Sequence, residues 1–190
     1  MRSPSIFNII LFIFIFFSFS LLGKENWILD KNLSTIYFEL PVLFANNVKG
    51  EFKEIKGLVE IDVETKKNNK AIFSVTLDSI DMNYKKYKGL LLGNIFFDTH
   101  KFPIALVDTK KFSYADQDQL DLEVELTIKG TSLLVPLKLE VHHLAEELIQ
   151  IKGKLKFSRN SFQIGTGKWA STIILKDKAY IQANLFLFKE

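Results

Sequence analysis

Few side chains in this sequence have the type and spacing of a catalytic or metal-binding group. The three histidines are His100, which lies just before Phe102-Pro103 in an expected loop, and the neighbours His142 and His143. Adjacent residues of a strand point to opposite faces, so His142 and His143 are not expected to bind one metal ion together. The chain has no cysteine, which excludes disulfide bonds, cysteine nucleophiles and cysteine-type zinc sites.

The other candidates for catalysis have simpler structural explanations. Ser161 lacks the G-x-S-x-G frame of a hydrolase nucleophile, and Gly165-Thr166-Gly167 lacks the third glycine of a dinucleotide site and indicates a turn. The carboxylate pairs Glu146-Glu147 and Glu123 with Glu125 fall where turns and solvated strand faces are expected. We therefore expect a protein that is not an enzyme, with no catalytic residues, no metal site and no catalytic cofactor.

The charges do not indicate a nucleic-acid partner. The 25 basic and 22 acidic residues are mixed along the chain and give a net charge of +3. Lys85, Lys86 and Lys88 alternate with Tyr84 and Tyr87, a composition that could contact nucleic acid or anionic lipid headgroups. A solvated helix face explains the same segment more simply.

Most of the chain has the period-two pattern of half-buried strands. In residues 120–128 apolar and polar side chains alternate, Lys129-Gly130 then supplies a turn, and residues 133–141 alternate again, which predicts a hairpin. The same alternation predicts further strands within residues 36–40, 59–61, 71–77, 149–157 and 181–187.

Residues 82–98 break this rhythm, and Tyr84, Tyr87 and Leu91 fall at helical spacing, which predicts a short helix. Many one-sided strands without alternating helices favour a single barrel or sandwich. Closure is preferred because it removes exposed edges.

The N-terminal segment has the composition of an export signal. Arg2 precedes an almost unbroken apolar run over residues 6–17, followed by small residues and then by the first charge at Lys24. We expect a signal peptide over residues 1–23, with an uncleaved membrane anchor as the alternative, and a single domain over residues 24–190. Six of the 18 phenylalanines lie in this signal, and twelve remain for the domain. Twelve phenylalanines are more than a small barrel needs to fill its centre, which suggests that their rings line an apolar cavity. A solid core is the competing interpretation.

Several blocks of the sequence carry a family resemblance. In order they are Trp27 to Asp30 with Ser34 and Phe38; Val48 to Phe52 with Gly57 and Asp62; Asp78-Ser79-Ile80; Phe96-Phe97-Asp98 through Phe102-Pro103; Leu126 to Thr131 with Val135-Pro136-Leu137; and Arg159, Phe162, Ile164, Gly165, Gly167 and Trp169. Together they resemble the YceI-like lipid or polyisoprenoid-binding domain. The last block is similar to the subgroup associated with cytochrome b561-like membrane proteins.

The resemblance implies an all-β, lipocalin-like, eight-stranded antiparallel β-barrel with a short helical insertion, exported to the periplasm or anchored at the outer face of the inner membrane. It also implies a long-chain isoprenoid lipid, of the quinone or polyprenyl phosphate type, bound in the lumen by a carrier or buffer. The family's arginine–aspartate pair and its histidine after the first strand are replaced here by Tyr87-Lys88 and by Val42. Arg159 is kept as a possible polar contact, with structural pairing as its alternative.

On this basis we expect nine residues to line the barrel: Phe38, Phe52, Phe73, Val75, Phe96, Phe97, Leu155, Phe157 and Phe162. The alternative function is an accessory module of a cytochrome b561-like redox system, with a barrel filled by its own side chains. An oxidoreductase or isomerase acting on a bound quinone is a third hypothesis, but the sequence offers it no acid–base pair. A homodimer is left open.

Overall fold

The computed structural model describes residues 23–63, 65–114 and 119–190 of the chain, and the expected signal peptide therefore falls almost entirely outside the described residues. The strands are β1 (Glu25–Leu29), β2 (Thr35–Leu40), β3 (Val48–Phe52), β4 (Ile55–Ile61), β5 (Lys70–Thr76), β6 (Ile80–Met82), β7 (Ile104–Asp108), β8 (Gln119–Ile128), β9 (Thr131–Ala145), β10 (Leu148–Ser158) and β11 (Lys178–Lys189). The helical segments are α1 (Lys88–Leu92) and four single 3-10 turns, at Leu77–Ser79, Lys85–Tyr87, Asn160–Phe162 and Gly167–Trp169.

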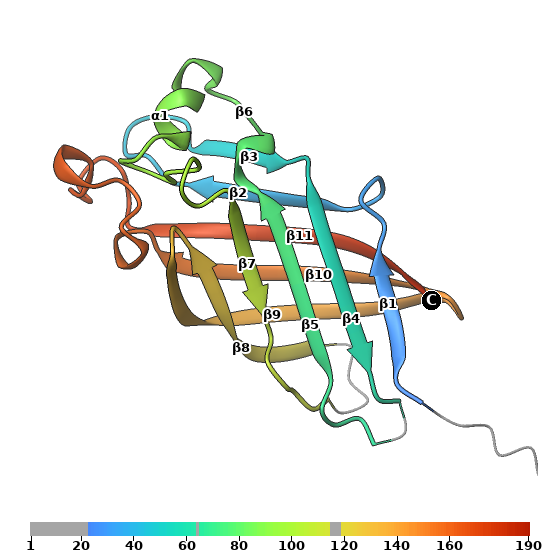
Figure 1. Cartoon of the computed structure of the whole chain (residues 1–190). Helices are drawn as coiled ribbons and strands as arrows, with labels where there is room; N and C mark the ends of the chain where they lie inside the picture. The colour runs from blue at the N-terminus through green and yellow to red at the C-terminus, as the bar shows by residue number, and fades with distance from the viewer. Residues whose placement is uncertain (1–22, 64, 115–118) are drawn as a thin grey trace, which may run out of the picture.

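Three pairs of short strands act as single bent strands. The first bent strand is β1 followed by β2, and both parts pair with β11. The second is β3 followed by β4: β3 pairs with β2, and β4 pairs with β1. The third is β5 followed by β6: β5 pairs with β4, and β6 pairs with β3. Counted in this way, eight antiparallel strands follow one another around a ring, each beside its neighbour in sequence, and β11 returns to β1 to close it (Figure 1). The expected eight-stranded barrel is confirmed.

Serine hydroxyls hold the bends in these strands. Ser34 Oγ accepts a hydrogen bond of 2.9 Å from the Phe186 N–H, where the ladder between β11 and its neighbour is interrupted. Ser79 Oγ accepts from the N–H groups of Lys53 and Glu54 and donates to the Thr76 carbonyl. A side chain thus satisfies backbone groups that the bend removes from the ladder.

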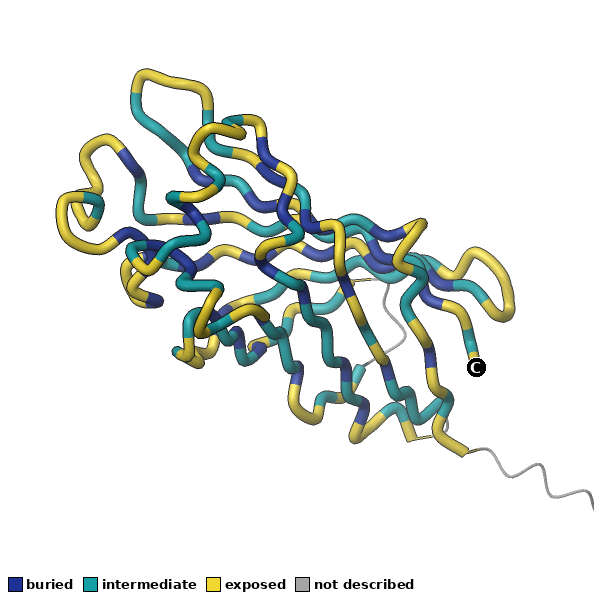
Figure 2. Tube along the Cα trace, turned by 45° about the horizontal axis from the view of Figure 1, so that its top comes forward, coloured by how far each residue is buried: buried dark blue, intermediate teal, exposed yellow. Residues whose placement is uncertain are grey.

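The alternating pattern places apolar side chains inside the barrel, and Figure 2 shows buried and exposed residues alternating along the strands. In β10, Ile149, Ile151 and Leu155 are buried, whereas Lys152 and Lys154 are exposed. The predicted hairpin is confirmed: Ile128 pairs with Thr131, and Lys129 and Gly130 between them have φ of 51° and 73°. Two positive φ angles are typical of a type I′ turn.

The barrel has two unlike ends. The helical end carries the connections 41–47, 83–103 and 159–177. The terminal end carries residues 62–63, 65–69 and 109–114 together with residues 24 and 190. The helix predicted within residues 82–98 is confirmed by α1, which ends where the Gly93 N–H bonds the carbonyls of Gly89 and Leu90. In the part of the chain that the structure describes, no helix has the length and apolar character needed to cross a membrane.

Candidate functional site

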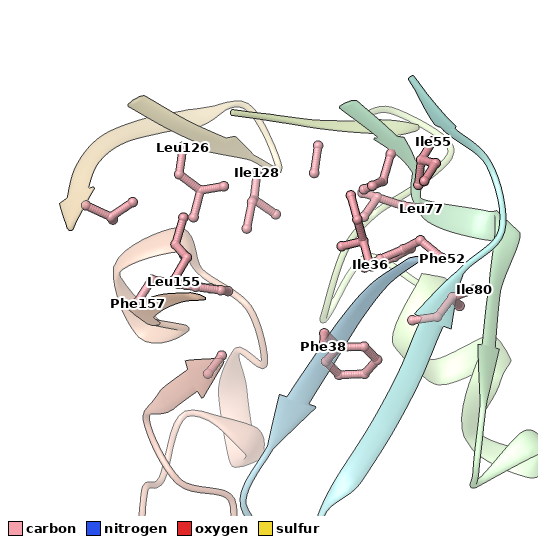
Figure 3. Packing of buried hydrophobic residues seen from close by; sticks show 14 of the residues in the cluster. Ile36, Phe38, Phe52, Ile55, Leu77, Ile80, Leu126, Ile128, Leu155 and Phe157 are labelled. Carbon is pink, nitrogen blue, oxygen red and sulfur yellow. The ribbon is translucent and has the colours of Figure 1, made fainter. Parts of the chain in front are cut away.

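The lumen of the barrel holds a cavity of about 460 Å³. Its walls are apolar and come from strands all around the ring; Figure 3 shows Ile36, Phe38 and Phe52 together on one side of the interior and Leu126, Leu155 and Phe157 on the other. Eight of the nine residues expected as walls line it: Phe38, Phe52, Phe73, Val75, Phe96, Phe97, Leu155 and Phe157. The interior is therefore not filled by its own side chains.

Phe162 is placed differently from the expectation. It lies in the 3-10 turn after β10, is only 1% exposed and does not line the lumen. Its ring packs edge-on against Phe157, with the centroids 5.3 Å apart. Phe162 thus supports a wall residue from behind, because it follows the strand rather than belonging to its inward face.

Small residues keep the lumen hollow. Gly153 of β10 lies directly opposite Ala183 of β11, and both line the cavity. Ala71, Ala105 and Ala179 are other small side chains of the wall. These small residues were not among the nine expected wall residues, which were mostly aromatic. Glycine or alanine at an inward position of an alternating strand would have indicated them in the sequence.

Glycines also determine where two of the rings lie. A Cβ on Gly50 would lie 2.6 Å from Cε1 of Phe38, and a Cβ on Gly57 would overlap the ring of Phe73. Each ring therefore approaches a neighbouring strand closely at the one point where that strand has no side chain. This packing is the physical reason for glycine at positions 50 and 57.

Among the described residues, the lining of the cavity is more deeply buried at the helical end than toward the terminal end. At the helical end its lining residues Leu91, Phe96, Phe97 and Ile164 are buried, and Trp169 packs edge-on against Phe96 with centroids 5.7 Å apart. At the terminal end the lining residues are half-buried or exposed: Val63, Phe112, Tyr114, Leu120, Val141 and His143. A ligand in the lumen would therefore have its deepest part beneath the helical insertion.

Arg159, the expected polar contact, is used by the protein itself. The side chain is 1% exposed, and its guanidinium donates to the carbonyls of Lys176, Ile164, Gly165, Ser171 and Leu175 and to the Asn160 amide oxygen, over 2.9–3.3 Å. Burial lowers the pKa of Arg159 below its ordinary value, while the Asp177 carboxylate partly opposes this. All five N–H donors have protein acceptors. Arg159 thus holds the 159–177 connection closed and has no donor left for a headgroup.

The other polar groups of the described lining are few, and two of them are engaged with other parts of the protein. The Thr109 hydroxyl accepts from the Ala71 N–H at 2.8 Å, and Glu25 at the terminal end pairs with Lys189 at 2.6 Å. His143 lines the cavity, whereas His142 shares the outer face with Glu140, 3.8 Å away, as expected for strand neighbours. Within the described ranges, no group of three His, Cys, Asp or Glu side chains could hold a metal ion.

The turn interpretation of Gly165-Thr166-Gly167 is confirmed. Both glycines have positive φ, 81° and 63°, and they lie in the connection that Arg159 holds. A Cβ on Gly165 would lie 2.8 Å from Arg159 Nη1. The glycine is therefore required by both its backbone conformation and the buried guanidinium.

Comparison with known proteins agrees with this architecture. The model of the YceI-like domain family matches residues 27–186. Among proteins with curated descriptions, none matches the chain in sequence.

The solved structures that share the fold include the following three. The crystal structure of Burkholderia cenocepacia BcnA is 24% identical, with a TM-score of 0.76 over 83% of this chain and 98% of that one. A polyisoprenoid binding domain from Saccharophagus degradans is 16% identical, with a TM-score of 0.70 over 86% and 98% of the two chains. The Campylobacter jejuni YCEI protein is 24% identical, with a TM-score of 0.65 over 79% and 90%.

Proposed function

Because the chain belongs to the YceI-like domain family, we propose that it is a non-catalytic binding protein that holds the chain of a polyisoprenoid lipid in the barrel lumen. The ligand is of the quinone or polyprenyl phosphate type, and the protein acts as its carrier or buffer. The proposal includes export to the periplasm, for which the composition of residues 1–23 is the support.

The observation that carries this proposal is the apolar cavity of about 460 Å³. Small-molecule pockets have volumes of roughly 300–1,000 Å³ and mostly apolar walls. Covering roughly 400 Å² of apolar tail at about 25 cal/mol per Å² would contribute on the order of 10 kcal/mol before the costs of association and ordering. Micromolar affinity is therefore within reach without a charged anchor. One solved structure of the same fold is described as a polyisoprenoid binding domain, which favours this ligand class.

The lumen also suggests how the ligand lies. Its walls are most fully buried beneath the helical insertion, and Arg159 there has all of its donors occupied. The apolar tail therefore points to the helical end, and the headgroup lies at the terminal end near Glu25 and His143. An accessory module with a filled barrel is the weaker candidate, because the cavity is unfilled.

Mass spectrometry of an organic extract tests the proposal. The chain is purified without detergent and compared with Ala183→Phe, which places a ring in the lumen, and with Gln182→Phe, which places the same ring on the outer face of the same strand. We expect a polyisoprenoid with the wild type and Gln182→Phe, and much less with Ala183→Phe. Absence of lipid from the wild type, or equal amounts from all three, would overturn the proposal.

A further inference from the structure

Three large apolar side chains lie in the open at the helical end. Phe44 is 98% exposed, Ile173 is 71% exposed and Ile174 is 63% exposed. They belong to the connections 41–47 and 159–177, which project beyond the strands on the left of Figure 1. We call these three residues the apolar tip. Single exposed apolar residues are ordinary, but a group of them indicates a contact surface.

The two connections are fastened to each other, so the residues of the apolar tip lie on adjoining segments. The Leu43 N–H donates to the Ile174 carbonyl at 2.8 Å, and the Lys176 N–H donates to the Pro41 carbonyl at 3.0 Å. Val42 and Leu175 form a bridge between the same segments. Phe44 itself has φ of 60°, a conformation that phenylalanine rarely adopts. The fold thus presents Phe44 to solvent at a cost, where a glycine or an asparagine would be the simpler turn residue.

Lysines are frequent in the segments that carry or adjoin the apolar tip. The segment 83–88 lies against the 41–47 connection. Asn83 Nδ2 donates a hydrogen bond to the Asn47 carbonyl at 3.0 Å, and the Tyr84 hydroxyl donates one to the Asn46 carbonyl at 3.4 Å. The segments 41–47, 83–88 and 167–176 together contain five lysines and no carboxylate: Lys85, Lys86, Lys88, Lys168 and Lys176. Of the bordering carboxylates, Glu39, Asp98 and Asp177 are paired with Lys49, Lys101 and Lys178, and Asp81 of β6, next to the segment 83–88, is exposed.

We propose that this end of the barrel docks on an anionic lipid bilayer. Phe44, Ile173 and Ile174 enter the boundary between headgroups and acyl chains, and the lysines of the same and adjoining segments lie against the phosphates. One small apolar element gives only weak membrane binding, whereas an apolar element combined with several basic residues gives stable binding. A stable protein partner would need roughly 1,000 Å² or more of contact, and three side chains at a loop tip offer far less.

The proposal does not depend on the lumen ligand, and its test keeps the two apart. Strands β1 to β11 close the barrel within residues 25–189, so residues 24–190 serve for the measurement. Binding is measured by co-sedimentation with vesicles of phosphatidylcholine alone, and with about a third phosphatidylglycerol, at low and high salt. We expect binding to the anionic vesicles, weakened strongly by salt. The lumen variant Ala183→Phe should bind vesicles as the wild type does.

Matched variants test each half of the surface. Phe44→Asn removes the ring and suits the positive φ, and we expect vesicle binding to fall about tenfold. Leu144→Asn removes an exposed apolar side chain, 51% exposed, at the terminal end and should change nothing. Lys85→Gln with Lys168→Gln should weaken binding about tenfold at low salt. Lys152→Gln with Lys154→Gln removes as much exposed charge from the outer face of β10 and should have little effect.

Insertion can also be seen directly. Phe44→Trp places a tryptophan at the apolar tip, and its emission, after subtraction of the wild-type emission from Trp27 and Trp169, should shift to the blue when anionic vesicles are added. Failure of the wild type to bind anionic vesicles would overturn the proposal, as would equal losses for Phe44→Asn and Leu144→Asn. Binding to polyglutamate in place of vesicles, sensitive to the lysine pair but not to Phe44, would assign the surface to an acidic protein and overturn the lipid assignment.

Discussion

Gly57 of β4 lies directly opposite Phe73 of β5, and the ring of Phe73 occupies the space that a Cβ on Gly57 would need. The same relationship joins Gly50 to Phe38, a neighbour across β2 and β3. Both rings line the cavity. The glycines therefore set the position of two aromatic walls, and their replacement provides a direct test of the packing.

Gly57→Ala should destabilise the protein, because the added methyl group displaces the Phe73 ring within the barrel. Overpacking of this kind costs about 1–3 kcal/mol, measured as the loss in free energy of unfolding by urea. The control is Gly89→Ala in α1, where a Cβ meets no atom within 4 Å. That variant should gain about 0.5–1 kcal/mol from its better helix propensity. Equal effects of the two substitutions would contradict the packing at Gly57.

Arg159→Lys should destabilise the fold, and it should not change which lipid the folded protein binds. An ammonium group has three donors, so several carbonyls that the guanidinium now satisfies would be buried without a partner. We expect a loss of about 3 kcal/mol or more in the free energy of unfolding. Lys156→Met, on the exposed face of the neighbouring strand, should be close to neutral. A fully stable Arg159→Lys protein that no longer carried lipid would contradict this account and support headgroup contact.

Asp108 should make part of the stability depend on acid pH. Burial raises the pKa of its carboxyl, but hydrogen bonds from the Lys110 N–H, at 2.7 Å, and from Lys110 Nζ outweigh this and lower it. A folded-state pKa below the unfolded value of about 3.9 means that the stabilisation is complete above about pH 4. It is lost as the pH falls through the folded-state pKa.

Asp108→Asn should therefore be less stable than the wild type at neutral pH, and the difference should shrink as the pH is lowered through the acid range. Urea unfolding measured near pH 7 and near pH 3 compares the two proteins. A difference that is the same at both values would show that the Asp108 charge contributes nothing.

Removal of the bound lipid should lower the melting temperature. A ligand present at about 100 times its Kd adds about 2.7 kcal/mol, which corresponds to roughly 5–10 °C for a domain of this size. Scanning calorimetry before and after organic extraction and refolding should show this drop for the wild type and Gln182→Phe. Ala183→Phe, whose lumen is occupied by its own ring, should melt at one temperature in both states.

The strands that could be predicted from the sequence are those with one solvent-exposed face and one buried face. β8, β9, β10 and β11 are long and alternate regularly, so their existence and hairpin order were readable. β7 was not predicted because it is a continuous apolar run, and β3 because a glycine occupies one of its inward positions. β6 has only three residues and shows no period.

The wall residues Phe38, Phe73, Val75, Leu155 and Phe157 were readable for a related reason, since an inward position on an alternating strand faces the lumen of any closed barrel. Phe52, Phe96 and Phe97 are wall residues that no predicted strand carried, because they lie on β3 and in the 83–103 connection. Phe162 and Arg159 were harder, because both lie at the edge of the 159–177 connection, where no periodicity indicates direction. Only the folded chain shows that Phe162 lies behind Phe157 and that the Arg159 guanidinium is surrounded by carbonyls.

By itself the sequence determined the all-β class, the interruption by a short helix and the set of apolar side chains available for the interior. These follow from local periodicity, which depends on neighbours a few residues apart. Tertiary structure decided that the barrel is hollow, because Gly153 and Ala183 meet only when β10 and β11 pair. It also decided that Phe44 and Ile174 lie on adjoining segments, since 130 residues separate connections that backbone hydrogen bonds bring together. Contacts between distant segments depend on register and closure, and no local pattern encodes them.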